Sequence, residues 1–108
     1  MKRRIEIMPR ADSDIDSQFV FLAQQSKAVA RKFLNEVNRT IQTIGKNPES
    51  GCLAETDDPD DVGLNVRTRP VEGFPSHLVF FIAIPDGVRI QRVLHAARRI
   101  TASMILDD

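Results

Sequence analysis

The segment 77–84 constrains the fold most, because seven consecutive apolar residues follow its histidine. The run is much shorter than the 18 or so residues that would span a bilayer. A run of this length and composition is typical of a strand that is covered on both faces. Pro85-Asp86-Gly87 then predicts a hairpin turn into a further strand at 88–95. The sequence therefore predicts a sheet with covering layers.

Two helices are predicted upstream of this hairpin. Ser13, with Asp16 three residues later, resembles a capping box and predicts the start of the first helix. Its apolar face consists of Ile15, Phe19, Leu22 and Ala23. Ser26 is the predicted N-cap of the second helix, and Gly45 and Pro48 predict its end. Its apolar face consists of Ala30, Phe33, Leu34, Val37, Ile41 and Ile44. The short connection predicts an antiparallel helical hairpin.

Two more strands complete the predicted order βααβββ. Residues 4–8 and 64–71 alternate in polarity as strands do. Residues 47–61 are polar and acidic and predict a loop, and residues 73–76 predict a turn. The fold class is therefore α+β, with the helical hairpin packed on a mainly antiparallel four-stranded sheet. We expect residues 1–108 to form one domain, with a core from about residue 4 to residue 100.

The composition fits a single globular domain. Of the 108 residues, 42% are hydrophobic and 28% are charged, which argues against a disordered or fibrous chain. The basic start is followed by Glu6 and Pro9, where a signal peptide would need an apolar run. The single Cys52 excludes an internal disulfide and suits a reducing compartment. We therefore expect a cytoplasmic protein.

The formal net charge is zero, but the charges are segregated along the chain. Residues 49–61 contain six acidic residues and no lysine or arginine, whereas residues 64–100 contain six arginines and two acidic residues. A protein that coats nucleic acid without selectivity would be basic overall, so an acidic partner must meet a local patch. The acidic run 57–61 lacks the spacing of a calcium loop, and we expect no metal or cofactor.

Four side chains on the predicted strands are candidates for binding or chemistry. Arg67 and Arg69 point the same way about 7 Å apart, so they could hold two carboxylates or phosphates, or form a solvated strand face. His77 and His95 open and close the last hairpin, as proton carriers or as structural hydrogen-bonding groups. Their spacing does not indicate a metal site.

Arg92 is predicted to share a strand face with Ile90 and Leu94 and thus to be partly buried. A buried guanidinium needs an anionic partner, for which Glu6 on the first strand is the candidate. A structural role and a binding role are both open for Arg92.

Several short motifs occur in a characteristic order. They are Ala11-Asp12-x-Asp14-Ile15, Ala30-x-x-Phe33-Leu34-x-x-Val37, Asn47-Pro48-x-x-Gly51, Val66-Arg67-x-x-Pro70-Val71-x-Gly73-Phe74-Pro75-x-His77-Leu78-Val79-Phe80-Phe81 and Ile90-x-Arg92-Val93-Leu94-His95-Ala96-Ala97-Arg98. With these motifs, about residues 5–100 resemble the RelE/ParE superfamily of bacterial type II toxins, and the ParE branch more closely.

The resemblance implies a toxin that a ParD-like antitoxin, encoded beside it, holds inactive, with DNA gyrase as the usual target of the ParE branch. The candidate residues for binding the target or partner are Arg67, Arg69, Arg89, Arg92, His95, Arg98 and Arg99. The candidate apolar contacts to the antitoxin are Phe19, Phe33 and Phe74. Because apolar stripes of this extent exceed what one small chain can cover, we expect a tight complex with the antitoxin.

Two other functions stay open. The RelE branch cuts messenger RNA on the ribosome, and here His77, Arg92 and His95 would have to carry that reaction. RelE-type cleavage relies on lysines and arginines in the sheet and a tyrosine near the C-terminus, but this chain has no tyrosine and no lysine after Lys46. Phe81 and Arg99 also depart from the ParE pattern, which often has tyrosine and aspartate there. The remaining alternative is a detoxified relative that only binds its partner.

Overall fold

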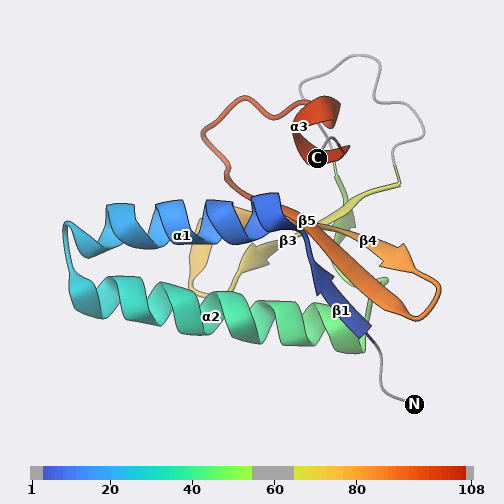
Figure 1. Cartoon of the computed structure of the whole chain (residues 1–108), viewed down its shortest axis with the longest axis horizontal. Helices are drawn as coiled ribbons and strands as arrows, with labels where there is room; N and C mark the ends of the chain where they lie inside the picture. Colours follow the sequence, from blue (N-terminus) through green and yellow to red (C-terminus); the bar gives the residue numbers. More distant parts are fainter. Residues whose placement is uncertain (1–3, 55–64, 107–108) are drawn as a thin grey trace.

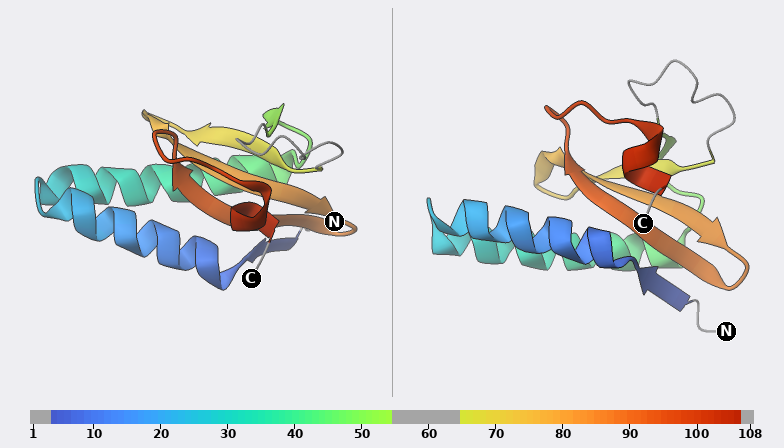
Figure 2. Two further views of the ribbon diagram at one scale, coloured as in Figure 1. Left: turned by 90° about the horizontal axis from the view of Figure 1, so that it is seen from above. Right: turned by 45° about the horizontal axis from the view of Figure 1, so that its top comes forward.

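The computed structural model describes residues 4–54 and 65–106. In this part of the chain the elements follow in the order β1, α1, α2, β2, β3, β4, β5 and α3 (Figure 1). Helices α1 and α2 lie side by side on one face of the sheet, and the short α3 lies over the other (Figures 1 and 2). The closed end of the helical hairpin projects beyond the sheet (Figure 1).

The sheet has five strands in the order β1-β5-β4-β3-β2. Their bounds are Arg4–Ile7 for β1, Cys52–Leu53 for β2, Arg67–Val71 for β3, Phe74–Ile84 for β4 and Gly87–His95 for β5. β1 pairs with β5 in parallel, and the other three pairs are antiparallel. The α+β class and the mainly antiparallel sheet are thus confirmed.

The strand count differs from the prediction of four, because β2 lies in the segment predicted as a loop. Its two residues are too few to show an alternating pattern, and pairing with β3 alone makes it a strand. The rest of the predicted acidic loop, residues 55–64, lies outside the described residues.

Helix α1 spans Pro9–Ala23 and starts earlier than predicted. Met8 is the N-cap without a side-chain hydrogen bond, and Pro9 occupies the first turn. A proline suits this place because the first helical N–H groups have no partner within the helix. The prediction that Ser13 caps this helix is therefore wrong by about one turn.

Helix α2 spans Lys27–Lys46 and begins as predicted. The backbone N–H of Val29 donates to the Ser26 hydroxyl at 3.2 Å, which confirms the N-cap. Gly45 lies within the last turn, where a Cβ atom would come within 2.5 Å of the Ile5 side chain. The glycine therefore permits close packing of α2 on β1.

The turns confirm one prediction and correct another. Pro85 and Asp86 form the tight turn between β4 and β5, as predicted. The turn before β4 is shorter than predicted, because only Glu72 and Gly73 form it and β4 already begins at Phe74. Gly73 has a φ of 78°, a backbone conformation that glycine adopts without steric cost.

Pro70 of β3 lies near the edge of the sheet, a place that suits proline in a strand. Ala54 donates to the Val66 carbonyl, so alternate residues of β3 direct their backbone groups toward β2. The backbone nitrogen of Pro70 therefore faces the β2 side of β3. Because β2 pairs only with Arg67 and Thr68, the missing N–H of Pro70 removes no hydrogen bond between strands.

The sheet carries a core on each face, and β4 contributes to both. Under α1 and α2, one core includes Phe33, Val37, Val79, Phe81 and Val93. On the opposite face, the other consists of Ala54, Val66, Phe80, Leu94, Ile100 and Ile105, with Met104 packed against it. The prediction that the apolar strand is covered on both faces is confirmed. The cover on the second face is the segment that ends in α3 (Ala102–Leu106), which lies beyond the core predicted to end at about residue 100.

Candidate functional site

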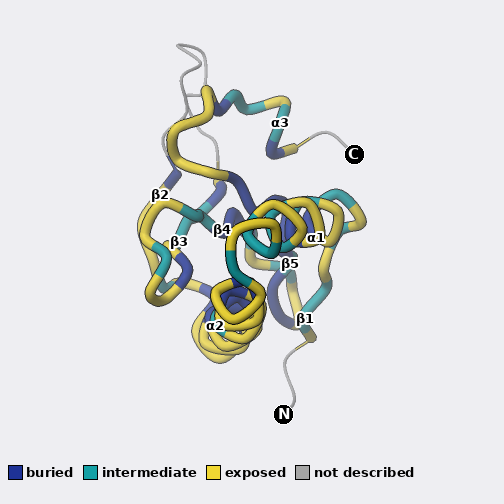
Figure 3. The backbone as a smooth tube through the Cα atoms, turned by 90° about the vertical axis from the view of Figure 1, so that its left-hand side faces the viewer, coloured by how far each residue is buried: buried dark blue, intermediate teal, exposed yellow. Residues whose placement is uncertain are grey.

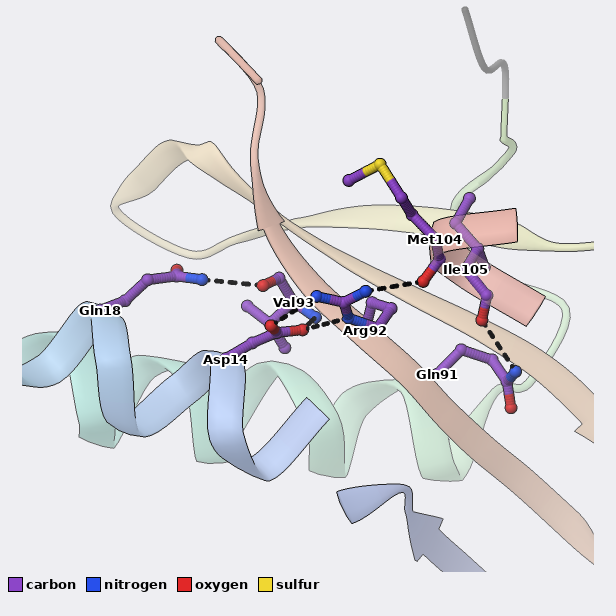
Figure 4. Close-up of polar contacts among 7 residues, drawn as sticks. All are labelled: Asp14, Gln18, Gln91, Arg92, Val93, Met104 and Ile105. Atoms are coloured by element: carbon purple, nitrogen blue, oxygen red, sulfur yellow. Dashed lines mark hydrogen bonds and ion pairs between the residues drawn. The ribbon is translucent and has the colours of Figure 1, made fainter. Parts of the chain in front are cut away.

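Arg92 of β5 lies at the centre of a buried hydrogen-bonded network (Figure 4). Its Nε and Nη2 atoms donate to the two carboxylate oxygens of Asp14 at 2.6 and 2.8 Å. Its Nη1 atom donates to the Met104 carbonyl at 2.7 Å. The side chains of Arg92 and Asp14 are only 7% and 13% exposed, and the hydrogen bond to Asp14 raises the pKa of Arg92. This geometry favours the structural role for Arg92.

The predicted partner of Arg92 was Glu6, and this prediction is wrong. A bulge places Phe80 opposite Arg92 but Phe81 opposite Ile90, so Gln91 is an extra residue on β5. The bulge turns Arg92 away from the face that carries Ile90. Glu6 instead accepts a hydrogen bond from Arg89 at 3.1 Å.

Helix α1 covers the edge of β5 that β1 leaves free. β1 pairs with β5 only as far as Ile90. Beyond that point the Val93 N–H donates to Asp14 at 3.1 Å, and the Gln18 amide donates to the Val93 carbonyl at 2.7 Å. Asp14 and Gln18 are four residues apart and so lie on the same side of the helix. Their side chains replace a neighbouring strand along this part of the edge.

The two histidines lie opposite each other on β4 and β5, with ring centroids 5.0 Å apart. Because the Gln18 amide nitrogen donates to Val93, its oxygen accepts from His77 Nδ1, at 2.6 Å. His77 also packs against the buried Phe33 ring at 4.8 Å. Burial, followed by the positive charge of His95, lowers the pKa of His77. His95 is exposed, and its Nδ1 accepts from the Ala97 N–H at 3.1 Å.

The structure does not bring the predicted arginines together on one surface. Arg98 and Arg99 are exposed just after β5, near His95. Arg89 pairs with Glu6 near the other end of β5. It is six residues before His95, so the two residues are up to about 20 Å apart along the strand.

Arg67 and Arg69 of β3 form a third group. They pair with Phe81 and Val79 and therefore share the sheet face on which α1 and α2 lie. Both are half-buried, and among the described residues neither pairs with an acidic group. The arginines predicted to bind a target or partner thus form three separate groups, with Arg92 buried apart from them.

The predicted apolar contacts also differ in exposure. Phe33 is fully buried and offers no surface to a partner in this conformation, whereas Phe19 and Phe74 are half-buried. The sequence reasoning missed the exposed apolar residues near the closed end of the helical hairpin. These are Val20, Phe21 and Val29, at 55%, 61% and 42% exposure. Phe21 could have been found, because the helical spacing places it off the apolar face of α1.

Residues 4–54 and 65–106 contain neither a candidate metal site nor a candidate membrane span. No group of three or more His, Cys, Asp or Glu side chains there could hold a metal ion. No helix in this range has the length and apolarity needed to cross a membrane. Cys52, on the edge strand β2, is exposed as a free thiol.

Comparison with known proteins identifies the family. A model described as "ParE toxin of type II toxin-antitoxin system, parDE" matches residues 5–100, nearly the whole chain. The chain belongs to the ParE toxin family. No curated protein sequence matches it.

Among solved structures, this ParE-family toxin is similar to a chain of the chromosomal ParDE toxin–antitoxin system from P. aeruginosa. The TM-score is 0.68 and the identity is 15%, over 87% of this chain and 96% of that chain. At this identity the similarity shows the fold alone. It agrees with the fold that the motifs had predicted.

The half-buried His77 predicts how the stability of this ParE-family toxin depends on pH. Since the pKa of His77 is lower in the folded state than its ordinary value of 6.5, the unfolded chain binds the proton more readily. The stabilisation is therefore complete above about pH 6.5 and is lost as the pH falls through the folded-state pKa. Urea unfolding from about pH 8 to about pH 5 should show a steeper loss in the wild type than in a His77→Gln variant. Parallel profiles for the two proteins would contradict this assignment.

Proposed function

We propose that this ParE-family toxin binds and inhibits DNA gyrase in the bacterial cytoplasm and that a ParD-like antitoxin neutralises it. The observation that carries the proposal is the exposed pair Arg98 and Arg99, beside the exposed His95 at the end of β5. Neither arginine pairs with an acidic side chain among the described residues. Guanidinium groups that form no ion pair within the fold can bind a carboxylate or phosphate of a larger partner.

The site supports binding better than bond cleavage. Of the three residues that a ribonuclease would use, Arg92 is engaged by Asp14 and Met104. His77 Nδ1 is engaged by Gln18, and a lowered pKa leaves this ring neutral near pH 7. His95 is then the exposed member of the set, and proton transfer at both the attacking and leaving oxygens needs two groups. The sequence has no tyrosine to supply the second.

The proposed antitoxin contact is the exposed end of the helical hairpin. Val20, Phe21 and Val29 are more exposed than apolar side chains usually are in a helix that packs on a core. Phe19, directly before Val20, is half-buried. Covering this apolar surface would stabilise a complex by the hydrophobic effect. The solved ParDE system, to which the chain is similar in fold, is by its description a toxin–antitoxin pair.

An Arg98→Ala/Arg99→Ala double variant tests the proposed target. We expect it to inhibit gyrase supercoiling at least about tenfold more weakly than the wild type, because truncating a charged anchor typically costs an interface on the order of 2 kcal/mol. The matched control is Arg39→Ala, on the exposed side of α2, where the arginine is 76% exposed and pairs with Glu36. This control should inhibit gyrase as the wild type does.

The outcomes separate the three candidate functions. Growth arrest with DNA damage, abolished by the double variant, supports gyrase inhibition. Growth arrest with intact DNA and rapid loss of messenger RNA would instead indicate the ribonuclease. A chain that binds the antitoxin but does not arrest growth when expressed alone would be the detoxified relative.

A further inference from the structure

The C-terminal segment 100–106 covers the second core, on the face of the sheet opposite α1 and α2. Ile100 and Ile105 are 7% and 1% exposed, and they pack with Val66, Phe80 and Leu94 in the second core. Residues 96–99, which connect this segment to β5, are all exposed (Figure 3). The cover is therefore attached through a solvated connection.

Helix α3 depends on two side chains of β5 for its place on the sheet. Five residues are too few for a helix to be stable by itself in water. The carbonyl groups of a helix's last turn also lack partners within the helix. Arg92 Nη1 donates to the Met104 carbonyl at 2.7 Å, and Gln91 Nε2 donates to the Ile105 carbonyl at 3.1 Å (Figure 4). Both donors come from the bulge in β5.

The same arginine connects α3 to α1. Asp14 holds Nε and Nη2 of Arg92, which leaves Nη1 directed at Met104. Asp14 also accepts from the Val93 N–H, so its position depends on how α1 lies against the free edge of β5. A displacement of α1 from that edge would release the guanidinium that holds α3.

One buried atom disfavours the packed position of residues 100–106. The Oε1 atom of Gln91 is buried and has no hydrogen-bond partner among residues 4–54 and 65–106, although its amide nitrogen donates to the Ile105 carbonyl. A buried unsatisfied acceptor has lost its hydration without compensation, and opening of the segment would return it to water. The unsatisfied Gln91 oxygen therefore lowers the stability of the packed position of residues 100–106.

We propose that residues 100–106 form a strap that opens and closes over the second face of the sheet, and that the Asp14–Arg92 pair couples its closure to the position of α1. The strap holds the far end of the connection that carries Arg98 and Arg99. Closure thus restricts where these two cations lie, and α1 controls it from the opposite side of the sheet. The regulatory consequence rests on the proposed function, but the coupling itself does not.

The reactivity of a buried thiol measures the opening of the strap. In a Cys52→Ser background, Ile105→Cys places a thiol on the buried side of the strap, and Val37→Cys places one in the core beneath α2, where Val37 has no exposed surface. When closing is faster than labelling, the labelling rate is proportional to the open population. Adding Asp14→Asn should speed labelling at position 105 by about 10- to 100-fold, the effect of losing a hydrogen bond to a charged group. Position 37 reports unfolding of the core and should label more slowly than position 105 in every background.

Two further variants make the test decisive. Asp16→Asn makes the same chemical change at an exposed position of α1 and should leave both rates unchanged. Gln91→Glu replaces the donor to Ile105 by a second acceptor but leaves the Asp14–Arg92 pair in place, so it should speed labelling at position 105 even if Asp14→Asn fails to fold. The proposal is overturned if Gln91→Glu leaves that rate unchanged, or if position 37 labels as fast as position 105. Because no assay here contains gyrase, these results are independent of the proposed target.

Discussion

Replacing Arg92 by alanine is expected to lower the free energy of unfolding by about 3–5 kcal/mol, among the largest effects of any single substitution in this chain. The variant leaves the Asp14 carboxylate buried without its cation, at 13% exposure. It also removes the donor to the Met104 carbonyl. Urea unfolding near pH 7 measures the change.

Arg89 provides the matched control on the same strand. Its ion pair with Glu6 has a similar nitrogen-to-oxygen distance of 3.1 Å, but the two side chains are 34% and 36% exposed. Solvent screens such a pair, so Arg89→Ala should cost less than about 1 kcal/mol. Equal losses for the two arginines would refute the claim that burial makes the Arg92 pair strong.

A double variant separates the buried charge from the lost packing. Asp14→Ala combined with Arg92→Ala should cost less than the sum of the two single substitutions, because neither charge is then buried alone. A coupling energy near zero would show that the two side chains do not act as a pair. The unfolding curves of the wild type, the two single variants and the double variant together form a double-mutant cycle.

Truncating Phe33 to alanine is expected to lower the free energy of unfolding by about 3–5 kcal/mol. Phe33 has no exposed surface, and its ring packs against Phe74 at 5.3 Å and against His77 at 4.8 Å. The variant leaves a cavity where α2 meets β4. Because burial is the main cause of the lowered pKa of His77, hydration of this cavity should also raise that pKa toward its ordinary value.

Phe21 is the matched phenylalanine, at 61% exposure on α1. Phe21→Ala should change the free energy of unfolding by no more than about 0.5 kcal/mol. The same variant should weaken binding of the antitoxin if the exposed end of the hairpin is its contact. Similar unfolding curves for the Phe33 and Phe21 variants would contradict the assignment of Phe33 to the core. Titration of His77 by NMR tests the change in its pKa.

These two residues show how a pattern can identify a residue as important while leaving its role open. Both Arg92 and Phe33 stand in motifs shared with a toxin family, and both were candidates for contact with a partner. The structure places both inside the fold. The candidate surface is consequently smaller than the sequence indicated, with Arg98 and Arg99 as its most exposed cations and Phe21 as an apolar residue added to it.

Local chemistry alone determined most of the elements. The apolar stripe after Ser26 predicted α2 because a helix repeats every 3.6 residues, and the hydroxyl of Ser26 caps it as expected. Pro85 and Asp86 form the predicted turn, and the uninterrupted apolar run predicted a strand buried on two faces. Signals of this kind depend on neighbours within a few residues, so the sequence displays them directly.

Tertiary structure alone decided which side chains meet. The bulge at Gln91 arises from pairing between β4 and β5. Because of it, Arg92 pairs with Asp14, 78 residues away, and not with Glu6. Strand β2 and helix α3 are too short to have a periodicity, and each forms because the sheet supplies its partners. Such contacts join residues far apart in the chain, where no local pattern records them. The sequence therefore determined the family and the elements, whereas packing decided which cations remain free to bind.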